Sequence, residues 1–167
     1  MRLTILTTGG TIDKTYDEFQ GSLRNVHTIL EFILGSLRLP DLFVRHLEVM
    51  HKDSLDMTEE DREIIAKAVC NAASSSDGIV ILHGTDTLAD TGEHLFKTCT
   101  DLTIPVILTG AMRPYEFRDT DAVQNVTEAL LAARLLDGGV YVAMHNRVLS
   151  FPGVKKDRQA RTFVRNG

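Results

Sequence analysis

The stretch from Val80 to Thr87 constrains the fold of this 167-residue chain more than any other. Its first three residues, Val-Ile-Leu, suit a buried strand and run directly into a turn at Gly84. An amphipathic helix is expected to begin after the turn, at Leu88. Thr85 and Asp86 would then lie at the carboxyl end of a strand, which is where open α/β sheets bind their ligands.

The same order of elements recurs along the chain. Besides the strand before Gly84, buried strands are expected at 2–7, 42–49, 104–108 and 140–144, and amphipathic helices at 26–37, 58–72, 88–99 and 122–133. Five strands alternating with four helices, with crossovers long enough for parallel pairing, predict an α/β fold. We expect one domain over 1–167, with a doubly wound, mostly parallel sheet of flavodoxin or Rossmann type and helices on both faces.

Two segments lack such a pattern. The polar run 13–22 is expected to be a mobile loop, and its aromatic residues Tyr16 and Phe19 could serve as a lid. Beyond Pro152 the chain is basic and unpatterned, with Lys155 and Lys156 side by side. We expect no regular structure in either segment.

The charge and length of the chain restrict its partners. A net charge of -5 argues against nucleic acid and anionic membrane surfaces as partners, because both need a surplus of Lys and Arg. No apolar run approaches the length that spans a bilayer, and the N-terminus turns polar too early for a signal peptide. A cytoplasmic protein that acts on a small molecule is the resulting expectation.

The cysteine and histidine spacing suggests no metal site. Cys70 and Cys99 are far apart in the sequence and lack Cys-x-x-Cys spacing, so neither a zinc site nor a redox pair is predicted, and both are expected to be free thiols in a reducing compartment. The six histidines show no His-x-x-x-His spacing. His83 and His145 each follow a strand and are expected to be structural.

Hydroxyl groups and one carboxylate gather at the predicted sheet edge. Thr11 follows Gly9-Gly10, and Thr85 precedes Asp86. A hydroxyl is a weak nucleophile unless a base accompanies it, and Lys156, kept neutral by burial and held by Asp86, could supply that base. Each residue also has a structural interpretation: Thr11 as a turn residue, Thr85 and Asp86 as a helix cap, and Lys156 as a solvated residue of the tail.

Three motifs together give a family resemblance. The segments Thr8-Gly9-Gly10-Thr11-Ile12, His83-Gly84-Thr85-Asp86-Thr87 and Thr109-Gly110-Ala111-Met112-Arg113-Pro114 stand in the order found in the bacterial-type L-asparaginases, which the chain resembles. The segment from Lys52 to Met57 agrees as well, and so do Asp121 and Asn125.

The resemblance implies roles for individual residues. Thr11 would attack the side-chain amide carbonyl, and Thr85, Lys156 and Asp86 would handle protons. Asp86 would also hold the α-amino group of the substrate and Ser54 its α-carboxylate. Tyr16 resembles the lid tyrosine of the family, and the remaining substrate-binding residues would be Gly10, Asp53 and Ala111. The family needs neither a metal nor an organic cofactor, and a homo-oligomer, dimer or tetramer, is expected.

The chain departs from typical members in two respects. They have two domains, and the resemblance covers only the first, so the chain is either an asparaginase that works without the second domain or a domain that binds aspartate or asparagine without turnover. Lys156 is assigned by counting from Val154, which leaves Lys155 as an alternative. Leu55 stands where many relatives carry Gln, which could alter the acceptance of glutamine. An amidohydrolase for another amide, such as glutamine, is a further possibility.

Overall fold

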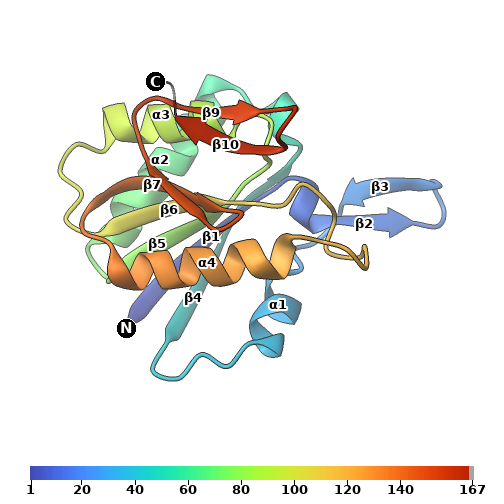
Figure 1. Cartoon of the computed structure of the whole chain (residues 1–167), viewed down its shortest axis with the longest axis horizontal. Coiled ribbons are helices and arrows are strands. Elements are labelled where there is room, and N and C mark those ends of the chain that lie inside the picture. Colours follow the sequence, from blue (N-terminus) through green and yellow to red (C-terminus); the bar gives the residue numbers. More distant parts are fainter. Residues whose placement is uncertain (166–167) are drawn as a thin grey trace.

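The computed structural model describes residues 1–165, and a six-stranded sheet forms its centre (Figure 1). Neighbouring strands follow the order β4-β1-β5-β6-β7-β8, and all pairs are parallel except β7 with β8. The strands are β1 (Arg2–Gly9), β4 (Phe43–Lys52), β5 (Gly78–Leu82), β6 (Pro105–Thr109), β7 (Gly139–Met144) and β8 (Arg147–Ser150).

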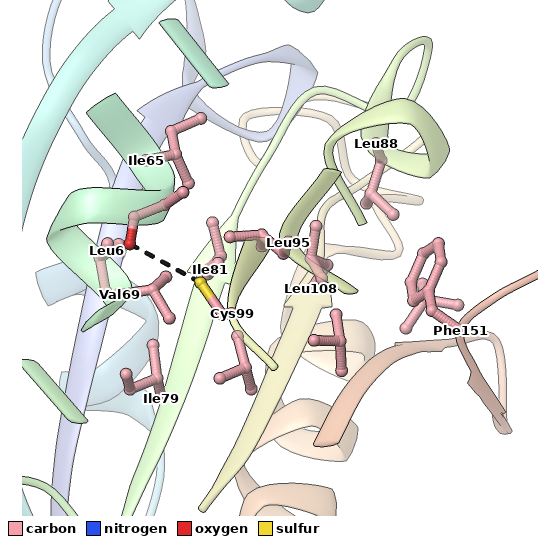
Figure 2. Packing of buried hydrophobic residues seen from close by; sticks show 14 of the residues in the cluster. Leu6, Ile65, Val69, Ile79, Ile81, Leu88, Leu95, Cys99, Leu108 and Phe151 are labelled. Atoms are coloured by element: carbon pink, nitrogen blue, oxygen red, sulfur yellow. Dashed lines mark hydrogen bonds between the residues drawn. The ribbon is translucent and has the colours of Figure 1, made fainter. Parts of the chain in front are cut away.

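Four helices cover the two faces of the sheet. Figure 1 shows α2 (Glu59–Ala73) and α3 (Leu88–Thr98) on one face, and α1 (Leu30–Ser36) and α4 (Ala122–Leu135) on the other. Successive residues of β5 alternate between the two cores: Ile79 and Ile81 pack with α2 and α3, as Figure 2 shows, whereas Val80 and Leu82 pack with α1 and α4. A strand buried on both faces therefore needs an unbroken apolar run. The predicted doubly wound α/β fold is confirmed.

The predicted number of five strands in the sheet was too low, because β8 joins the sheet as an antiparallel edge strand. His145 and Asn146 link it to β7, and both have left-handed backbone angles, with φ of 55° and 59°. Two such residues in succession form the tight turn that matches the twist of a hairpin. The strand itself carries only a weak apolar signal, since it has just four residues and two of them, Arg147 and Ser150, are polar.

Two separate hairpins replace the irregular segments expected from the sequence. The prediction of a mobile loop at 13–22 is wrong, because β2 (Lys14–Asp17) pairs with β3 (Ser22–Asn25). The resulting hairpin projects from the body of the molecule (Figure 1). The prediction that the chain beyond Pro152 lacks regular structure is wrong too, because β9 (Val154–Asp157) pairs with β10 (Thr162–Arg165). Both hairpins are rich in polar residues, so the alternation that marks a half-buried strand is faint in them.

The first helix is shorter than its apolar spacing predicted. It begins at Leu30 rather than at Val26, whose side chain is exposed. The carboxylate of Asp13 accepts hydrogen bonds from the Thr28 hydroxyl and the Ile29 amide, and these bonds hold the preceding residues in a non-helical path. Within residues 1–165, no helix has the length and apolar character needed to cross a membrane.

Candidate functional site

The turns that follow β1 and β5 touch each other through two glycines. A Cβ atom added to Gly10 would lie 2.4 Å from the Cα of Gly84. Only glycines allow this approach, and Gly10 also has a φ of 90°, which other residues rarely adopt. The contact places the start of the short helix η1 (Thr11–Asp13) beside the turn that carries Thr85.

The backbone amide of Gly10 is already engaged. It donates a hydrogen bond of 3.0 Å to the carbonyl oxygen of Lys52, so Gly10 shapes the turn and its N–H is not free for a ligand. The next amide, that of Thr11, begins η1 and therefore has no acceptor within that helix. The Thr11 side chain itself is half-buried.

Ser54, which follows the end of β4, lies beside the turn at Gly84. A Cβ atom added to Gly84 would lie 2.5 Å from Ser54 Oγ, and the Thr87 hydroxyl donates to the Ser54 carbonyl at 2.8 Å. The Ser54 side chain is only 1% exposed, and its hydroxyl has no hydrogen-bond partner among residues 1–165. A buried hydroxyl without a partner is costly, so this donor is available for a ligand.

Lys156 reaches the site from β9. Its Nζ atom donates to Thr85 Oγ1 at 2.8 Å and to Asp86 Oδ1 at 3.0 Å. Thr85 is buried and the Lys156 side chain is 15% exposed, whereas Lys155 is exposed. The structure therefore brings Lys156, and not Lys155, to Thr85 and Asp86.

A second cation also contacts Asp86. The Nη2 atom of Arg158 lies 3.4 Å from Asp86 Oδ1, and its side chain remains largely exposed. Arg158 was missed at the level of sequence because it falls in a segment expected to be an unpatterned tail. Its position in the turn between β9 and β10 brings it back over the sheet edge.

Asp53 is paired with a residue that the sequence did not suggest. Lys14, at the start of β2, contacts its carboxylate at 2.7 Å, and the Leu55 amide donates to it at 3.1 Å. The hydrogen bond from Lys14 is the main reason why the pKa of Asp53 is lowered. Asp53 thus anchors the projecting hairpin to the site.

Ala111 and its neighbours are held by a polar cluster beneath them. Asp121 accepts hydrogen bonds from the amides of Met112 and Arg113 and from the side chains of Asn125 and His145. Burial alone would raise the pKa of Asp121, but these hydrogen bonds outweigh it, and the pKa is lowered. The cluster fixes the turn after β6, in which Ala111 is almost fully buried.

His83 is structural, as expected. It is completely buried, with Nδ1 at 2.8 Å from the Gly84 carbonyl and Nε2 at 2.9 Å from the Thr91 hydroxyl. Burial lowers its pKa to about 4, so the ring is neutral at physiological pH. It ties the Gly84 turn to helix α3.

Tyr16 is not part of this cluster. Its side chain is 58% exposed on the projecting β2–β3 hairpin, and its backbone amide donates to Glu116. No group of three or more metal-ligating side chains occurs within residues 1–165. The structure thus gathers Gly10, Thr11, Ser54, Thr85, Asp86 and Lys156 at one edge of the sheet, with Asp53 and Ala111 supporting it.

Comparison with known proteins identifies the family. A model of the N-terminal part of asparaginases matches residues 2–163. The L-asparaginase of Thermococcus kodakarensis is 37% identical over 158 residues, which make up 93% of this chain and 48% of that protein. Its solved structure superposes with a TM-score of 0.84 at 34% identity, covering 93% of this chain and 48% of the other.

A second kind of relative belongs to the glutamyl-tRNA(Gln) amidotransferase of Thermoplasma acidophilum. One polypeptide of that enzyme is 30% identical over 144 residues, or 86% of this chain and 35% of the relative. The chain spans about half, or less, of the length of these relatives. Since the family model covers nearly every residue, the chain belongs to the asparaginase family, to whose N-terminal part it corresponds.

Proposed function

We propose that the chain hydrolyses the side-chain amide of L-asparagine to aspartate and ammonia, with Thr11 as nucleophile and an acyl-enzyme intermediate. The contact of Lys156 with Thr85 and Asp86 is the observation that carries the proposal. It joins an amine, a hydroxyl and a carboxylate in one unit, and the glycine contact brings that unit beside the turn that leads into Thr11.

In the proposed substrate pose, the chain binds the α-ammonium and α-carboxylate groups of the amino acid. The anionic Asp86 would pair with the α-ammonium group, and the hydroxyl of Ser54 would donate to the α-carboxylate. Ser54 is suited to this role because its hydroxyl is buried and lacks a partner within the described chain. These contacts would leave the side-chain amide of the substrate directed toward Thr11.

Acylation follows from the nucleophile. Thr11 Oγ1 would add to the amide carbonyl carbon as its proton passes to the Thr85–Lys156 pair, and the oxygen of the tetrahedral intermediate would bind backbone N–H groups of the two turns. Because the Gly10 amide is occupied, the amides of Thr11 and Thr85 are the candidates for this role. The C–N bond would then break, and the nitrogen would leave as ammonia after taking up a proton.

Deacylation restores the nucleophile. Water would add to the Thr11 ester, the ester C–O bond would break, and aspartate would leave. Thr85 and Lys156 would relay the protons, with Asp86 holding the amine in place. Each turnover thus consumes one water molecule and releases one ammonia molecule.

Ammonia release from L-asparagine and L-glutamine, measured in parallel, tests the proposal. We expect turnover of asparagine that is lost in Thr11→Ala and partly kept in Thr11→Ser. Thr127→Ala, on the exposed face of α4, is the matched control and should keep full activity. Preference for glutamine would change the assigned substrate, and unchanged turnover in Thr11→Ala would refute the nucleophile.

Calorimetry separates this function from the binding-domain alternative. Binding of aspartate without ammonia release would favour a domain that holds the amino acid through Asp86 and Ser54 but does not react with it. The cytoplasmic location, the homo-oligomeric state and the lid role of Tyr16 also stay predictions.

A further inference from the structure

The two cysteines of the chain meet between α2 and α3. Cys70 lies in the last turn of α2, and Cys99 directly follows the end of α3. Their Sγ atoms are 3.2 Å apart and share a hydrogen bond, although both thiols are free. Figure 2 shows the Cys99 sulfur directed toward α2, where it also approaches the Ala66 carbonyl oxygen.

We propose that Cys70 and Cys99 are a reversible oxidation site, which a low-molecular-weight disulfide such as glutathione disulfide converts to an intrachain disulfide between α2 and α3. The spacing of the two residues in the sequence offered no reason to expect such a pair. The inference does not depend on the proposed hydrolase function, because neither thiol belongs to the site at Thr11 and Thr85.

The geometry requires little movement. A disulfide bond has a length of about 2.05 Å, so the sulfurs need to approach each other by roughly 1.2 Å. Both residues are at helix ends, where the backbone adjusts more easily than in a helix centre. The contact between the sulfurs therefore leaves only a short approach for bond formation.

The two thiols differ in access. Cys70 is exposed, whereas Cys99 is only 7% exposed. A cavity of about 240 Å³ is lined by both cysteines and by neighbouring residues of the two helix ends, among them Ala73 and Thr98. An oxidant can therefore reach Cys70 from solvent, and Cys99 is reached through the pair.

The acidity of Cys99 also indicates that Cys70 reacts first and Cys99 second. Burial, and then the hydrogen bond with Cys70, raise the pKa of Cys99 to about 12, so this thiol stays protonated at neutral pH. A thiol that stays protonated is a poor first nucleophile. Cys70 is therefore the residue that attacks the oxidant, and Cys99 is the residue that resolves the mixed disulfide. Although few Cys99 thiols are deprotonated, the contact between the two sulfurs favours this second step.

Glutathione disulfide accepts the two electrons that the two protein thiols lose. The Cys70 thiolate attacks one sulfur of glutathione disulfide, whose S–S bond breaks and releases the first glutathione as a thiolate. This thiolate takes up a proton as Cys99 loses its own. The Cys99 sulfur then attacks Cys70, the mixed disulfide breaks, and the second glutathione leaves as a thiolate that takes up from solvent the proton Cys70 had released. Two protein thiols are oxidised, and one disulfide is reduced to two thiols.

Intact-mass measurement of the full chain tests the proposal, because the chain contains just these two cysteines. After incubation with glutathione disulfide we expect a loss of about 2 Da, no titratable thiol, and full reversal by dithiothreitol. A product with the mass of a single chain distinguishes an intrachain bond from an interchain one.

Two variants make the order of reaction visible. Cys99→Ala should stop at the mixed disulfide of Cys70 with glutathione, and Cys70→Ser should remain unmodified because the Cys99 thiol is buried. A wild-type chain that accumulates the mixed disulfide, forms disulfide-linked dimers or does not react would overturn the proposal.

Thermal unfolding supplies an independent measurement. A cross-link across the segment between the two cysteines restricts the unfolded chain, and we expect the Tm of the oxidised protein to rise by about 5–10 °C. Cys70→Ser exposed to the same oxidant should show no rise. An oxidised wild type with an unchanged or lower Tm would show that the bond forms only with distortion, contrary to the close approach of the two sulfurs.

Discussion

Lys156 Nζ lies 2.8 Å from Thr85 Oγ1, although the two residues are 71 positions apart in the chain. The contact exists because the β9–β10 hairpin returns to the carboxyl edge of the sheet, beside the turn after β5. Asp86, at 3.0 Å from the same nitrogen, completes the unit. The proposed catalysis depends on this relationship more than on any other.

The first prediction concerns the lysine itself. Lys156→Met keeps most of the side-chain volume but removes the amine, and we expect the rate of ammonia release to fall by about 10²–10⁴-fold, the usual size of a general-base contribution. Lys155→Met is the matched control, since this neighbour is exposed, and it should stay within a few-fold of wild type. Equal losses in the two variants would contradict the assignment.

Ser54→Ala should separate substrate binding from stability. A hydrogen bond to a charged group contributes about 1.5–3 kcal/mol, so the KM for asparagine should rise by roughly 10- to 100-fold. The variant removes a buried hydroxyl that lacks a partner in the described structure, and its Tm should therefore equal or exceed that of wild type. Ser74→Ala, at an exposed position, should change neither quantity; a lower Tm for Ser54→Ala would point to a structural role instead.

Gly10→Ala should unfold or inactivate the protein. The added methyl group would lie 2.4 Å from the Gly84 Cα, and the backbone at Gly10 has a φ of 90°. We expect a loss of about 3 kcal/mol or more in the free energy of unfolding, measured by urea denaturation. Gly35→Ala in α1 is the control: nothing lies within 4 Å of the added atom, and the higher helix propensity of alanine should stabilise the protein by up to about 1 kcal/mol.

The stability of the protein should fall in mildly acidic solution because of His83. Its pKa is about 4 in the folded chain and 6.5 ordinarily, so between these values the unfolded chain binds a proton that the folded chain does not. The free energy of unfolding should thus decrease by about 3 kcal/mol as the pH falls from 6.5 to 4.

Comparison with His83→Asn isolates this contribution. The difference in unfolding free energy between wild type and variant, measured by urea titration at several pH values, should shrink across that window because asparagine does not titrate. A difference that stays constant with pH would show that His83 is protonated equally in the folded and unfolded chains.

Much of the sheet could be predicted because its signal is local. The buried strand β5 requires apolar residues on both faces, and the run before Gly84 supplies them. Thr58 and Asp61, three positions apart in the sequence, likewise form a capping box at the start of α2. In both cases neighbouring residues alone carry the information.

The hairpins and their contacts could not be predicted in this way. Lys14 contacts Asp53 from the first residue of the projecting β2–β3 hairpin, and Arg158 contacts Asp86 from the turn of the β9–β10 hairpin. Short polar strands leave little apolar pattern, and the ion pairs of exposed side chains leave none. The exposed position of Tyr16 has the same origin, since the β2–β3 hairpin projects from the body (Figure 1).

The sequence by itself determined the fold class, the strand ends that carry Thr11, Ser54 and Thr85, and the family motifs. Only the tertiary structure decided between Lys155 and Lys156, because neighbouring residues of a strand point to opposite sides and the pairing of β9 sets which side meets Thr85. It likewise brought together Cys70 and Cys99, since the distance between two helix ends depends on how the helices pack.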